Sequence, residues 1–92
     1  MNRAIYNVVT TILNEGVLES HTTAFKTLTA ATVCLTVLSR GYNRDSRFIG
    51  YENSPFYTVT RTERDGKTIA IKAESTGEPK LLIIEIIETP LF

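Results

Sequence analysis

The chain has 92 residues, of which 42% are hydrophobic and 22% charged, a balance typical of one globular domain and unlike that of a disordered protein. Ten basic and ten acidic residues give a net charge of zero, which argues against a general nucleic-acid coat protein and leaves only a local basic patch for nucleic acid. A chain of this size buries only about 60 to 65% of its unfolded surface, so assembly with a second chain is favoured.

Cysteine content and apolar runs indicate where the protein works. The lone Cys34 cannot form an internal disulfide, which fits a reducing compartment. The N-terminal segment has neither the apolar run nor the small-residue cleavage site of a signal peptide. The most apolar stretch, residues 24–38, is too short and too rich in threonine to span a bilayer. We therefore expect a cytoplasmic protein without membrane contact.

The first predicted element is a helix. Apolar residues recur at the spacing of one helical stripe, at Ile5, Val8, Val9, Ile12 and Leu13. Gly16 follows where a left-handed C-cap is expected.

The second predicted element is a helix from Ser20, whose hydroxyl can cap the first turn, to Arg40, with Gly41 as its stop. The many β-branched residues of 29–37 also suit a strand, but the length without glycine or proline favours a helix. Residues 42–55 are predicted to connect this helix to a sheet, with a short strand over 47–51 as an optional fourth strand.

A hairpin follows, and its register can be predicted from the side chains. A three-residue loop of Arg64, Asp65 and Gly66 keeps apolar residues on one face, whereas a two-residue turn mixes the faces. The predicted cross-strand pairs are Glu63 with Lys67, Arg61 with Ile69, Val59 with Ile71 and Tyr57 with Ala73. The other face then carries threonines and is expected to face solvent.

The last predicted strand, Leu81 to Thr89, is apolar on both of its faces. Leu81, Ile83 and Ile87 fall on one side, and Leu82, Ile84 and Ile86 on the other. We expect this strand at a sheet edge, where such hydrophobicity needs a partner. The predicted oligomer interface consists of Leu82, Ile84, Ile86, Val33 and Val37.

Together these elements predict one α+β domain over residues 1–92. Its two N-terminal helices pack on a C-terminal antiparallel meander of three or four strands.

The chain lacks the residue patterns that most catalytic sites require. With one histidine, one cysteine and no clustered ligand spacing, the sequence gives no signal of a zinc site or of a Cys-His nucleophile pair, and no phosphate-binding glycine loop is present. We therefore predict no catalytic residue, no metal and no cofactor. Glu85, inside the last apolar run, is expected to protect an edge or form an interface ion pair.

One segment, Arg40 to Tyr57, combines arginines with aromatic residues. The candidate binding residues are Arg40, Tyr42, Arg44, Arg47 and Tyr51. Arginine forks grip phosphate or carboxylate and aromatic rings stack on bases, but both residue types are also common in protein interfaces. The alternative is that the rings cap the core and the arginines are solvated.

Two functions follow from these patterns. The first is a small non-enzymatic, homo-oligomeric interaction protein that binds another macromolecule, like a bacterial or phage accessory or inhibitor protein. The alternative is a ligand-binding module that sequesters a nucleotide or another phosphate-bearing small molecule through the 40–57 segment.

Overall fold

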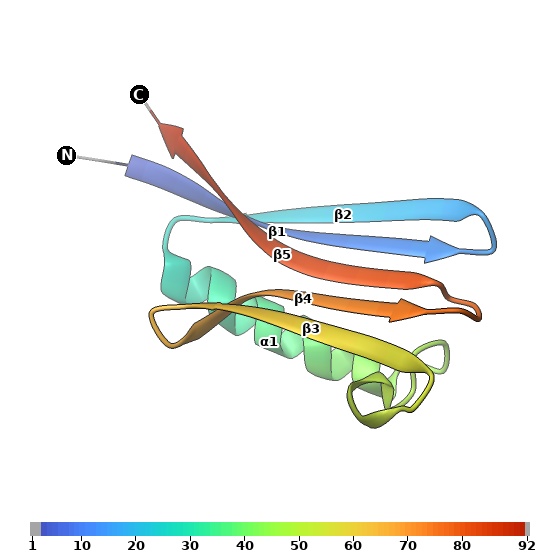
Figure 1. Ribbon diagram of the computed structural model, residues 1–92. Helices are drawn as coiled ribbons and strands as arrows, with labels where there is room; N and C mark the ends of the chain where they lie inside the picture. Colours follow the sequence, from blue (N-terminus) through green and yellow to red (C-terminus); the bar gives the residue numbers. More distant parts are fainter. Residues whose placement is uncertain (1–2, 92) are drawn as a thin grey trace.

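A computed structural model describes residues 3–91 and shows five antiparallel strands with a helix packed on one face (Figure 1). The strand order is β2-β1-β5-β4-β3. The elements are β1 (Arg3–Asn14), β2 (Val17–Phe25), α1 (Leu28–Arg44), the short 3-10 helix η1 (Tyr51–Asn53), β3 (Tyr57–Arg64), β4 (Lys67–Ser75) and β5 (Leu81–Leu91). The predicted fold of two N-terminal helices on a C-terminal meander is therefore wrong.

The predicted first helix is strand β1. Its apolar residues fit a helical stripe, but on a strand they divide between the two faces, with Val8 and Ile12 buried against the helix. Glu15 and Gly16 have φ values of 50° and 77°, which form a two-residue hairpin turn into β2. Gly16 thus turns a hairpin instead of capping a helix. Pairing on both sides, with β2 and β5, outweighs the weak local preference for helix.

The predicted second helix begins eight residues later than expected, at Leu28 instead of Ser20. Thr27 is the N-cap, and its side chain accepts a hydrogen bond from the backbone N–H of Ala30 at 3.1 Å. Ser20 lies within β2, which pairs with β1 along its whole length. The helix also runs through Gly41 and ends at Arg44, because a glycine inside a helix is a weak stop.

The β3–β4 hairpin has a register different from the predicted one. Asp65 and Gly66 form a two-residue turn, with φ values of 52° and 75°, and a register shift follows between Thr62 and Glu63. Val59 consequently pairs with Ala73, two residues from the predicted partner. A shift of two residues keeps the side chains of residues 57–61 on their predicted faces, which is why the burial pattern alone could not exclude it.

Strand β5 is central and not at an edge. It pairs with β1 along its whole length and with β4 over residues 81–85. The most hydrophobic strand therefore gains neighbours on both sides from its own chain. The optional strand over 47–51 is absent, because these residues form a turn that leads into η1.

The core lies between α1 and one face of the sheet. Its fully buried hydrophobic residues are Val8, Ile12, Ala31, Leu35, Phe48, Tyr51, Ile71, Ala73, Leu82 and Ile84. The chain ends lie side by side at one end of the sheet, where Arg3 pairs with Leu91 (Figure 1). Among residues 3–91, no helix lies on the far face of the sheet (Figure 1).

Candidate interaction surface

The face of the sheet opposite α1 is called here the open face. Side chains alternate along each strand, so residues that neighbour the core positions in sequence point to this face. Its large apolar residues are Ile5, Val9, Leu13, Leu18, Leu81, Ile83, Ile87 and Leu91. Every one of them is half-buried or exposed, so the described chain leaves this apolar surface uncovered.

Strand register makes four of these apolar residues contiguous. Leu13 pairs with Leu18 on β2 and with Leu81 on β5, so three leucines form one row across three strands. Ile83 lies one row further along, beside Leu81 on the same face of β5. The result is an apolar strip of Leu18, Leu13, Leu81 and Ile83 at the end of the sheet that carries the β1–β2 turn. Contiguous patches of this kind mark interaction sites more often than scattered apolar residues do.

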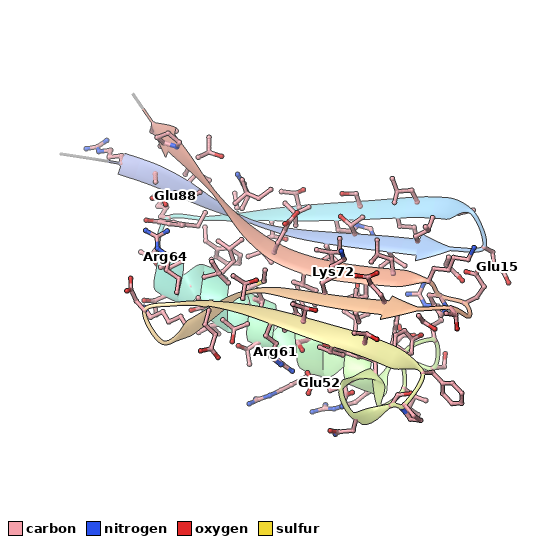
Figure 2. All side chains as sticks on the ribbon, in the orientation of Figure 1. Glu15, Glu52, Arg61, Arg64, Lys72 and Glu88 are labelled. Carbon is pink, nitrogen blue, oxygen red and sulfur yellow. The ribbon has the colours of Figure 1, made fainter. Side chains whose placement is uncertain are left out.

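Polar side chains surround the strip. Strand β3 contributes three threonines, at positions 58, 60 and 62, and β4 contributes Lys72 and Glu74, which form an ion pair at 3.0 Å. Lys72 projects from the sheet on the side away from α1 (Figure 2). Glu85 lies between Ile83 and Ile87 on the open face of β5, and no ion pair of the described residues includes it.

The residues that the sequence assigned to an oligomer interface lie partly in the core and partly at the surface. Leu82 and Ile84 are 0% exposed beneath α1, and Ile86 packs partly buried against the same core. The uncovered side of β5 is therefore the other one. Val33 and Val37 lie on the outer side of α1 and are 59% and 61% exposed, so they remain at the surface.

The aromatic residues of the 40–57 segment complete the core. Phe48 and Tyr51 are both 0% exposed. The ring of Phe48 meets that of Tyr42 edge to face at 5.6 Å, and Tyr57 lies 6.2 Å from Phe48 and 6.4 Å from Tyr51. These rings pack on one another, so Tyr51 does not present a stacking face to a ligand.

The arginines of the segment do not converge on one point. Arg47 donates to the Asp45 carboxylate through Nε at 3.3 Å and Nη2 at 3.4 Å, and its Nη1 lies 3.7 Å from Glu19. Hydrogen bonds from the Arg47 backbone and side chain hold the pKa of Asp45 below its ordinary value. Arg40 and Arg44 are exposed on α1. The charge of Arg47 is thus already balanced within the chain.

Sequence reasoning missed a polar cluster that joins α1, η1 and β3. The hydroxyl of Ser39 donates to Glu52 Oε1 at 2.7 Å and shares a 2.7 Å hydrogen bond with the Tyr51 hydroxyl. Arg61 Nη2 lies 3.1 Å from the same Glu52 oxygen, and both side chains lie on the helix side of the sheet (Figure 2). The cluster borders a depression of about 210 Å³ that Arg40 also lines. No spacing signal links residues so distant in sequence.

The pKa values of two ionisable groups are shifted in this cluster. Burial raises the pKa of Glu52, but hydrogen bonds from Ser39 and Arg61 outweigh burial, and the pKa lies below its ordinary value. Burial raises the pKa of Tyr51. Because no buried side-chain nitrogen or oxygen of the described residues lacks a hydrogen-bond partner, we interpret the cluster as a clamp that holds the 40–57 segment.

The clamp predicts a pH-dependent effect of Glu52→Gln. A carboxylate whose folded pKa is depressed stabilises the fold above its unfolded pKa of about 4.3, and this stabilisation is lost as pH falls through the folded value. The substitution should therefore lower the free energy of unfolding by about 1 kcal/mol at pH 7, the difference between a charged and a neutral acceptor. At pH 3 the two proteins should differ less. Urea unfolding at both pH values measures this, and an equal deficit at both would contradict the clamp.

Within the part of the chain that the structure describes, no three histidine, cysteine, aspartate or glutamate side chains gather as metal ligands. None of the described helices has the length and hydrophobicity needed to cross a membrane.

Comparison of the chain with models of protein families, with curated proteins and with solved structures found no significant match.

Proposed function

We propose that this chain is a small non-enzymatic interaction protein that binds another protein through the open face of its sheet. The observation that carries the proposal is the apolar strip, which lies on a sheet whose other face is already covered by α1. Contiguous exposed apolar area is costly to leave in water, and a partner surface removes it from water.

The chemistry of the open face favours a protein partner. A protein interface has an apolar centre and a polar rim, and here the leucine row and Ile83 are bordered by threonines and by the Lys72–Glu74 ion pair. The charged residues of the face, Arg3, Lys72, Glu74 and Glu85, are two bases and two acids. A face without excess basic charge lacks the electrostatic attraction that dominates binding to the phosphates of a nucleic acid or of an anionic membrane.

The substitution Ile83→Lys tests the proposal. It places a charge within the strip, and burying that charge against a partner without a counter-ion should abolish binding. Tagged wild type and variant are used to capture partners from the native host, and the captured protein is identified, purified and titrated against both. We expect at least a 100-fold loss of affinity for Ile83→Lys.

The matched control is Thr60→Lys, which adds the same charge to the threonine column of β3, away from the strip. It should bind within a few-fold of wild type, and circular dichroism should show that both variants fold. Unchanged affinity of Ile83→Lys for the purified partner would overturn the proposal. An equal loss of affinity in both variants would also overturn the proposal, because the loss would then come from the added charge itself and not from contact with the strip.

The alternative of a phosphate-binding module receives less support from the geometry. Arg47 is engaged by Asp45 and Glu19, and Tyr51 is buried. Self-association and a cytoplasmic location stay predictions, the first from the size of the chain and the second from the lone Cys34.

A further inference from the structure

Strand β2 forms one edge of the sheet, and this edge is long and unprotected. All of its residues from Val17 to Ala24 are exposed, and it contains no lysine, arginine, proline or glycine. Its acidic residue, Glu19, has its carboxylate 3.7 Å from Arg47 Nη1. An edge strand of nine residues without such blocking features is a template for another strand.

The opposite edge of the sheet is protected. Strand β3 carries Arg61, Glu63 and Arg64, and its pairing with β4 is interrupted by a register shift beside Glu63. Charged side chains and irregular pairing are the features that proteins use to prevent edge-to-edge association. The two edges therefore differ, and β2 is the one suited to strand addition.

Hairpin geometry shows which backbone groups of β2 are free. Asn14 and Val17 flank the two-residue turn, and in such a hairpin the flanking pair exchanges both backbone hydrogen bonds. Bonding then alternates along the ladder. The residues whose N–H and C=O groups point away from β1 are Leu18, Ser20, Thr22 and Ala24.

We propose that β2 pairs antiparallel with β2 of a second copy of this chain, around a two-fold axis at His21. In this register Val17 pairs with Phe25, Leu18 with Ala24, Glu19 with Thr23, Ser20 with Thr22, and His21 with itself. The free backbone groups then face one another and form about eight hydrogen bonds. A shift in either direction shortens the ladder, and a shift that brings Glu19 opposite itself adds charge repulsion. The strand is complementary to its own copy, which is why we choose that partner.

The proposed dimer has a consequence for the open face. An antiparallel pair has its two-fold axis perpendicular to the sheet, so both helices lie on one side and both open faces on the other. Two five-stranded sheets become one continuous sheet with twice the binding surface. The inference goes beyond the proposed function, and because it concerns β2 alone, its failure would leave binding by the open face untouched.

Proline at Thr22 tests the dimer. It removes a free backbone N–H from the edge, and proline is tolerated at an edge where the N–H faces solvent. The matched control Thr22→Ala keeps the N–H. In light scattering across a dilution series we expect wild type and Thr22→Ala to reach dimer mass, while Thr22→Pro stays monomeric with an unchanged circular dichroism spectrum. A wild type that is monomeric throughout, or a Thr22→Pro dimer, would overturn the inference.

A cross-link tests the register without depending on how the proline variant folds. His21 is a non-hydrogen-bonded pair with its copy, about 4.5 Å apart at Cα, which is within the range of a disulfide. In a Cys34→Ala background, which removes the native thiol, His21→Cys should oxidise to a covalent dimer that reducing agent reverses. Thr23→Cys is the control, since its two copies lie roughly 13 Å apart along the strand. Equal cross-linking of both variants would contradict the register.

Discussion

Replacing Ile84 with alanine is expected to lower the free energy of unfolding by about 2 to 5 kcal/mol, a large part of the 5 to 15 kcal/mol that stabilises a typical domain. Ile84 is 0% exposed, and its strand neighbours Thr10 and Ile71 are buried as well. Truncation leaves a cavity that α1 and the sheet cannot close without moving packed residues.

The matched control for Ile84→Ala is the adjacent Ile83→Ala. Ile83 lies on the open face, so the same truncation should cost less than about 1 kcal/mol. Urea unfolding followed by circular dichroism measures both variants, with an unchanged m-value as the check that the denatured state is the same. Equal destabilisation of the two variants would mean that the two faces of β5 are buried alike, which contradicts the open face.

Replacing Phe48 with alanine is expected to lower the free energy of unfolding by about 3 to 5 kcal/mol, although Phe48 lies outside the helices and strands of the sheet. The ring is 0% exposed and packs between those of Tyr42 and Tyr57, and the Arg47 guanidinium carbon lies 5.7 Å from its centre. Its loss removes burial, aromatic contacts and a cation–π contact together.

Phe56→Ala is the control for this segment. Phe56 is 78% exposed, and its truncation should change the free energy of unfolding by no more than about 0.5 kcal/mol. Thermal and urea unfolding of both variants distinguish the two roles that aromatic residues of the segment can have. If Phe48→Ala were as stable as wild type, the rings would be free for a ligand, and the interpretation of the segment as a cap on the core would fail.

The two hairpin turns show which features local sequence can predict and which it cannot. Asp65 and Gly66 were placed in the turn, but the predicted three-residue loop with Arg64 was wrong, because Arg64 pairs with Lys67 and the pairing shifts between Thr62 and Glu63. A displacement of two residues leaves the inward and outward side chains unchanged, so alternation cannot detect it. Glu15 and Gly16 carry the same kind of turn, yet a helical stripe upstream made Gly16 resemble a helix cap.

The sequence likewise predicted only part of the candidate interaction surface. Alternation along β5 was enough to show that both faces are apolar and that one chain covers only one of them. Which face the helix covers depends on where α1 packs, and α1 packs on the Leu82 and Ile84 side. The Ser39, Glu52 and Arg61 cluster was likewise invisible, because three segments must fold before its members meet.

Local sequence thus decides the features that depend on near neighbours: a helix that includes residues 28–40, Asp65 and Gly66 as turn residues, and the alternation of the C-terminal strands. Long-range pairing decides the rest. The N-terminal segment and residues 17–25 have sequences compatible with helix or strand, and pairing with β5 and with each other makes them strands. The physical reason is that backbone hydrogen bonds of a sheet join residues up to 88 positions apart, as in the pairing of Arg3 with Leu91 (91 − 3 = 88), where no local pattern can report them.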